Sequence, residues 1–102
     1  MDISSAEQQV YDLLASGNSL PVRVRNKLPW TEDEFNELLQ SIDVLIQGWS
    51  QEHSVPKRIA LAFVDIYGAF NFREGFYPQD KLMFLEDMAI ALQDKATELF
   101  SE

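Results

Sequence analysis

The feature that most constrains the fold is the spacing of apolar residues after Trp30. Seven large apolar residues recur every three or four positions and fall on one side of a helix: Phe35, Leu38, Leu39, Ile42, Leu45, Ile46 and Trp49. Thr31 and Glu34 have the spacing of a capping box, and Trp30 and Phe35 that of a hydrophobic staple. The pattern predicts a core-facing helix over residues 32–50.

Four further segments are expected to be helical, over residues 6–15, 21–27, 56–70 and 79–100. Ser4 or Ser5 is expected to cap the first of them. Residues 20–28 are ambiguous, because Val22-Arg23-Val24-Arg25 alternates like a strand. We favour a helix there, since a lone strand would have no partner. The sequence therefore predicts an all-α fold, a compact bundle of four to five helices forming a single domain over residues 1–102.

Catalytic and metal-binding residues are not expected. The chain has no cysteine and a single histidine, His53, which lies in a predicted loop without a second histidine to complete a metal site. Adjacent acidic pairs such as Glu86 and Asp87 diverge on a helix and do not converge on one substrate. No phosphate-binding loop or nucleophile elbow is present. We expect no enzyme activity and no cofactor.

The chain is expected to be soluble and cytoplasmic. Its N-terminus lacks the basic and apolar regions of a secretory signal, and no stretch reaches the about 18 apolar residues that span a bilayer. The most apolar window, residues 59–72, is interrupted by Asp65. An unpaired carboxylate inside an apolar helix is costly, so we expect Asp65 to pair with Arg58 or with a basic residue of a partner, and we favour Arg58.

The net charge of −9 argues against partners with an anionic surface. A basic cluster, Arg23, Arg25 and Lys27, lies between the helices predicted at residues 6–15 and 32–50. This order of elements resembles a helix-turn-helix motif in outline. The first turn of the 32–50 helix carries three carboxylates where DNA phosphates would approach, so nucleic-acid binding is not expected. A degenerate helix-turn-helix regulator stays open as an alternative.

The helices predicted at 56–70 and 79–100 carry more apolar residues than their buried faces need. This surplus, together with nearby carboxylates, predicts a binding surface. Its residues are Glu32, Asp33, Glu34, Glu37, Leu61, Val64, Tyr67, Met83, Phe84, Glu86, Asp87 and Ile90. Tyr67 and Trp49 are candidate aromatic anchors.

The function expected from these features is that of a small acidic protein-binding domain. Immunity proteins, antitoxins and phage-encoded inhibitors share its size and charge, so an inhibitor that neutralises a basic protein partner is the first hypothesis. The alternative is a homodimeric structural or regulatory module that associates through the outer side of the 56–70 helix. No membrane partner is expected.

Overall fold

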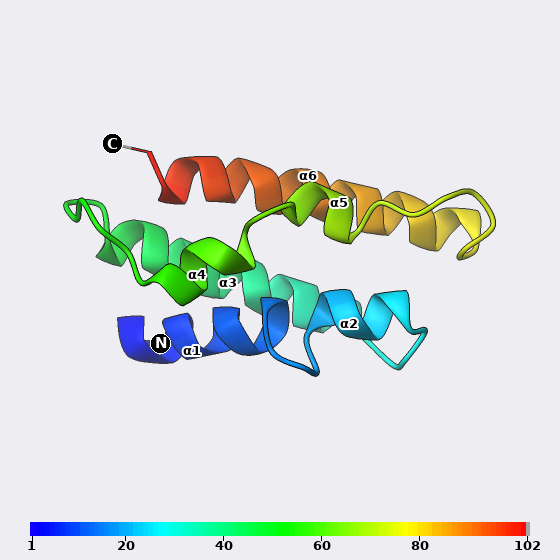
Figure 1. Cartoon of the computed structure of the whole chain (residues 1–102), viewed down its shortest axis with the longest axis horizontal. Helices are drawn as coiled ribbons and strands as arrows, with labels where there is room; N and C mark the ends of the chain where they lie inside the picture. The colour runs from blue at the N-terminus through cyan, green and yellow to red at the C-terminus, as the bar shows by residue number, and fades with distance from the viewer. Residues whose placement is uncertain (102) are drawn as a thin grey trace.

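The computed structural model describes residues 1–101 and contains only helices and connecting segments in that part of the chain (Figure 1). Glu102, which the predicted domain 1–102 includes, lies outside the described residues. The helices are α1 (Ile3–Leu14), α2 (Leu20–Arg25), α3 (Glu32–Gly48), α4 (Lys57–Ala62), α5 (Ile66–Ala69) and α6 (Gln79–Leu99). The predicted all-α class is confirmed. The described residues form six helices where four to five were expected.

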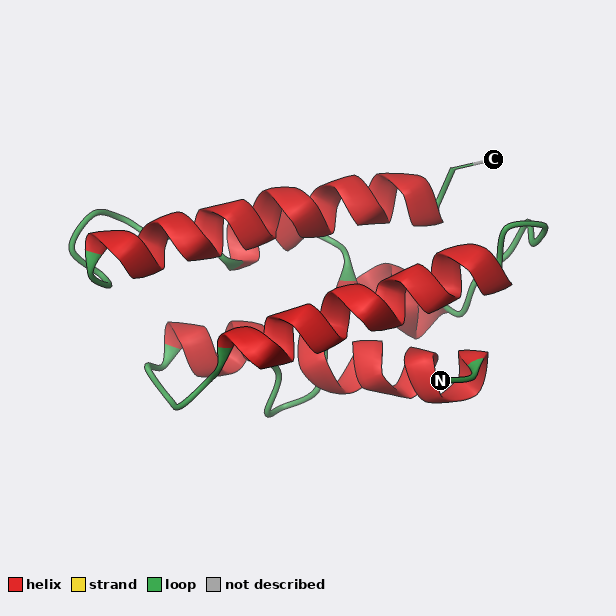
Figure 2. Cartoon of the chain, turned by 180° about the vertical axis from the view of Figure 1, so that it is seen from behind, coloured by secondary structure: helices red, strands yellow, loops and turns green. Residues whose placement is uncertain are grey.

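Two long helices, α3 and α6, run side by side through the molecule (Figures 1 and 2). An ion pair joins them, with Lys95 Nζ at 2.6 Å from Asp43 Oδ1. Helix α1 packs against α3 and α4, and the short α5 packs against α6. The shorter helices therefore close the core over the two long ones.

The start of α3 has the two features that the sequence predicts. The Glu34 N–H donates to Thr31 Oγ1 at 3.2 Å, and the Thr31 N–H donates to Glu34 Oε1 at 3.0 Å. The Trp30 ring meets the edge of Phe35, with ring centroids 5.5 Å apart. These contacts satisfy backbone donors that a helix end otherwise leaves without partners, and they fix the chain direction into α3.

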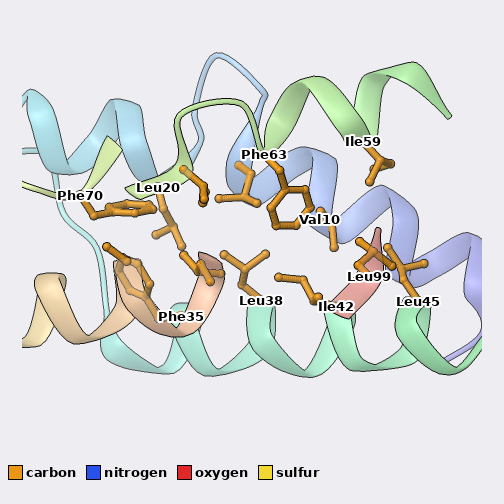
Figure 3. Packing of buried hydrophobic residues seen from close by; sticks show 14 of the residues in the cluster. Val10, Leu20, Phe35, Leu38, Ile42, Leu45, Ile59, Phe63, Phe70 and Leu99 are labelled. Carbon is orange, nitrogen blue, oxygen red and sulfur yellow. The ribbon is translucent and has the colours of Figure 1, made fainter. Parts of the chain in front are cut away.

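The core lies between α3 and the helices around it (Figure 3). Helix α3 supplies Phe35, Leu38, Ile42 and Leu45, all fully buried. The other helices and their ends contribute buried residues that include Val10, Leu20, Ile59, Phe63, Phe70, Leu85, Leu92 and Leu99. Helix α1 begins earlier than expected, at Ile3, because Asp2 and not a serine is the N-cap: the Asp2 side chain accepts the Ser5 N–H at 2.7 Å.

Residues 20–28 contain a helix, α2, as favoured over a strand. Pro21 occupies its first turn, where the missing N–H of proline costs no hydrogen bond. The loop between α5 and α6 is tied to this helix, because the Tyr77 hydroxyl donates to the Val24 carbonyl at 2.7 Å. Phe76 stacks on Phe72 in the same loop, with ring centroids 4.7 Å apart. These aromatic residues are therefore structural.

The helix expected over residues 56–70 is two helices, α4 and α5, separated at Asp65. Asp65 has a left-handed backbone, with φ 57° and ψ 36°, which an α-helix cannot contain. The break lets α4 pack against α1 and α5 against α6, two contacts in different directions. The expected ion pair of Asp65 with Arg58 is also wrong: Arg58 Nη2 lies 3.1 Å from Glu7 Oε2, and its guanidinium lies over the Tyr11 ring.

Candidate protein-binding surface

The break between α4 and α5 places apolar side chains in solvent. Leu61 is 70% exposed and Val64 is 69% exposed, and Tyr67 on α5 is also exposed. We call these three residues the α4–α5 patch. Their helices bury the opposite side through Ile59, Phe63 and Ile66, so the patch is not needed to hold α4 and α5 in place.

An open groove of about 540 Å³ borders this patch on the side of α6. Phe63 and Ile66, which are buried, and Phe100, which is exposed, give it an apolar lining. The lining residues are Ala60, Phe63, Val64, Asp65, Ile66, Tyr67, Gln93, Ala96, Thr97 and Phe100. The groove therefore lies between α4–α5 and the C-terminal half of α6, and we call it the α5–α6 groove.

Leu61 and Val64 border a second hollow, of about 420 Å³, along α4. Lys57 and Arg58 complete its lining together with Ala60. Because Val64 and Ala60 line both hollows, the patch forms an apolar ridge between them. A ridge with a hollow on each side is a shape that a complementary protein surface can enclose.

Asp65 is the one charged side chain among the described residues that line the α5–α6 groove. Its carboxylate lies directly beside Gly68: a Cβ atom at position 68 would stand 2.6 Å from Asp65 Oδ1. Glycine at position 68 is therefore what allows the carboxylate to occupy this place. The sequence alone did not identify the role of Gly68, because it depends on the left-handed backbone at Asp65.

Helix α6 carries further exposed apolar residues beside carboxylates. Met83 is 56% exposed and Ile90 is 46% exposed, and Glu86 and Asp87 between them are exposed as well. Ile90 lies one helical turn before Gln93, which lines the groove, so the two share one side of α6. Gln93, Thr97 and Phe100 were not predicted as site residues, although their spacing of four and three residues places them on one helical face.

Phe84 is less exposed than the other apolar residues predicted for the binding surface. It is half-buried, stacks on Trp30 with ring centroids 6.0 Å apart, and meets the edge of Phe35 at 5.5 Å. The contact with Trp30 comes from another part of the chain, so the periodicity of α6 could not show it. Trp49, the other candidate anchor, is half-buried and packs against the core.

The carboxylates of α3 lie apart from the α4–α5 patch. They stand at the start of α3, beside α2, whereas the groove lies toward the end of α6 (Figure 1). Glu32 and Asp33 are exposed, and Glu37 accepts a hydrogen bond from Gln9 Nε2 at 3.5 Å. The site predicted from the sequence is therefore divided between two regions of the molecule.

Glu34 is engaged within the chain. Its Oε2 lies 2.7 Å from Arg23 Nη2, and this hydrogen-bonded pair holds the pKa of Glu34 below its ordinary value. Burial opposes this effect by raising the pKa of Glu34, and the hydrogen bond from the Thr31 backbone lowers it again, so the net pKa stays below the ordinary value. Glu34 is thus a structural residue, and it is unavailable to a partner without breaking the pair.

The basic cluster is also partly engaged. Besides its pair with Glu34, Arg23 donates to the carbonyls of Asn18 and Pro29 at 3.1 Å and 3.3 Å. Lys27 Nζ lies 4.6 Å from the centre of the Phe76 ring, a cation–π contact. Arg25 is exposed. Two of the three cations therefore stabilise the fold, which leaves little positive surface for a phosphate backbone.

Within residues 1–101, no group of three or more His, Cys, Asp or Glu side chains is placed to hold a metal ion. None of the helices in the same residues is long and apolar enough to cross a membrane. Comparison of the chain with protein-family models, with curated proteins and with solved structures gives no significant match.

Proposed function

We propose that this chain is a protein-binding domain and that its partner is a protein with a basic surface. The observation that carries the proposal is the exposure of Leu61 and Val64 on a ridge between two hollows. Exposed apolar side chains grouped in this way are costly in water and are stabilised when a partner covers them. In this proposal the chain acts by binding and carries out no reaction.

Charge supports the choice of a basic partner. The net charge of −9 attracts a basic protein over long distances and repels a second acidic one. Glu86 and Asp87 lie on the exposed side of α6 that also carries Ile90. These carboxylates would steer the encounter, and the α4–α5 patch would supply the lasting contact.

The biological form we propose is an inhibitor of the immunity or antitoxin type, which neutralises its basic partner by covering part of its surface. The support for this form is the small size and the acidity of the chain. The binding surface itself does not require it, because the same patch would serve any basic protein partner.

The test is capture of the partner from a lysate of the source organism, with identification by mass spectrometry. Leu61→Glu places a charge on the ridge, and Leu28→Glu makes the same change at another exposed leucine. We expect the wild-type chain and Leu28→Glu to retain the same basic protein and Leu61→Glu to lose it. Capture that is equal for all three chains would refute the proposed surface.

Light scattering after size exclusion separates this function from homodimerisation. We expect the wild-type chain to elute as a monomer at micromolar concentration, because two copies that each carry a net charge of −9 repel one another. A dimer that Leu61→Glu dissociates, and that Leu28→Glu leaves intact, would instead establish the homodimeric module.

A further inference from the structure

The α5–α6 groove combines an apolar lining with one negative charge at its edge. Val64, Tyr67 and Phe100 supply exposed aromatic and aliphatic surface, and Gln93 and Thr97 supply polar groups along α6. Asp65 is the charged residue. Such a groove favours an occupant that is apolar on one side and carries a cation next to that side.

The Asp65 carboxylate is available to such a cation. It has no side-chain hydrogen bond as the N-cap of α5, and no ion pair with another described residue. Asp65 adopts a backbone conformation that non-glycine residues rarely take, and Gly68 leaves room for its carboxylate. The fold thus holds an exposed charge at the edge of the groove, with no partner in the described chain.

The walls of the groove decide which kind of segment fits. One wall is helix α6, and the other is centred on the turn between α4 and α5. The N–H groups of Phe63, Val64 and Ile66 donate to carbonyls three residues earlier, so this wall offers no strand edge for a partner strand to extend. The α6 wall runs from Gln93 to Phe100, which is about 10 Å or two helical turns. A helix can present apolar residues at three- and four-residue spacing over this length.

We infer that the α5–α6 groove receives a basic amphipathic helix of the partner protein, with its apolar side on Val64, Tyr67 and Phe100 and a lysine or arginine on Asp65. This inference rests on the proposed function and names the part of the partner that is bound. A second copy of this chain is a poorer occupant, because its net charge of −9 opposes the approach.

The test uses a defined probe, a fluorescein-labelled peptide of about fourteen Leu and Lys residues with leucines at helical spacing. Fluorescence anisotropy measures its dissociation constant for four chains: wild type, Asp65→Asn, Val64→Glu and Asp12→Asn. Asp12→Asn removes one exposed carboxylate on α1, away from the groove, and so controls for net charge. Asparagine also tolerates the left-handed backbone at position 65.

We expect Asp65→Asn to weaken binding about fivefold and Val64→Glu to weaken it more than about tenfold, with Asp12→Asn within about twofold of the wild type. A peptide of the same composition with scrambled order should bind at least about tenfold more weakly, since it lacks an apolar side. Circular dichroism of each variant establishes that its helical fold is retained.

Three outcomes would overturn the inference: no binding of the amphipathic peptide to the wild type, equal binding of the scrambled peptide, or equal effects of Asp65→Asn and Asp12→Asn. The proposed function would still stand in each case if the wild-type chain captures the partner from the lysate and Leu61→Glu does not. Conversely, peptide binding in the groove together with unchanged capture by Leu61→Glu would reject the proposed ridge and leave the groove as a helix-binding site.

Discussion

Glu34 contributes to stability through two contacts at once, as the N3 residue of the capping box and as the partner of Arg23. The pair lowers the pKa of Glu34, so the ionised form stabilises the folded chain. That contribution is complete above the ordinary pKa of 4.5 and is lost as the pH falls through the lower pKa of the folded state.

We expect Glu34→Gln to lower the free energy of unfolding by about 0.5–1 kcal/mol at neutral pH, because glutamine keeps the capping box and loses the ion pair. The difference from the wild type should shrink at acidic pH, as the pH falls below 4.5 and through the lower pKa of the folded state, because the carboxyl then becomes protonated. Urea unfolding at neutral and at acidic pH measures it. Glu32→Gln in the same helical turn is the control, and an equal loss in that variant would show that the pair contributes nothing.

Tyr77 connects the loop before α6 to α2 through its hydroxyl, which donates to the Val24 carbonyl at 2.7 Å. We expect Tyr77→Phe to lower the free energy of unfolding by about 1 kcal/mol, since the ring stays in place and the carbonyl loses its donor. Tyr67→Phe removes a hydroxyl from the exposed α4–α5 patch and should leave stability within about 0.5 kcal/mol. Similar losses in both variants would contradict this role of the loop.

At the scale of elements, the long helices follow from the sequence and the break at Asp65 does not. Capping signals and apolar spacing place α3 within two residues at its end. The buried residues Ile59, Phe63, Ile66 and Phe70 keep helical spacing across the break, so their pattern predicts one helix. The break depends on tertiary contacts: α4 must reach α1 while α5 reaches α6. Helical periodicity carries no information about such a division.

Substitutions at position 65 distinguish a break from a continuous helix. In a continuous helix alanine is about 1 kcal/mol better than glycine. At the observed φ of 57° the order reverses, because glycine adopts this backbone without strain and alanine does not. We therefore expect Asp65→Gly to be at least as stable as the wild type and Asp65→Ala to be about 1 kcal/mol less stable, measured by urea unfolding. Greater stability of the alanine variant would mean that residues 57–69 form a single helix.

At the scale of the whole molecule, the outward position of single residues was predictable and the assembly of a surface was not. Leu61, Val64, Met83 and Ile90 are exposed, as helical spacing indicates. Phe84 is covered by Trp30, which lies about fifty residues away in the chain. The α5–α6 groove likewise needs the contact between two helices. Properties of one helix can be derived from its sequence, whereas hollows between helices follow from packing.

For the whole molecule, the surface charge and the apolar ridge are expected to affect different rate constants of binding. Carboxylates on the outside of the molecule act before contact and so govern the association rate, whereas the ridge acts after contact and governs dissociation. Glu86→Gln combined with Asp87→Asn removes two exposed charges from α6, and Leu61→Ala removes apolar surface from the ridge. Both changes would be measured by surface plasmon resonance with the captured partner.

We expect the α6 double variant to lower the association rate constant about two- to fivefold at low salt, with little change in dissociation, and the difference to vanish near about 1 M salt, where exposed charges are screened. Leu61→Ala should instead raise the dissociation rate constant about tenfold at every salt concentration, because a buried leucine contact is lost. An association rate that is independent of salt for the wild type would contradict a role for the acidic charge. A Leu61→Ala effect confined to the association rate would place Leu61 outside the final contact.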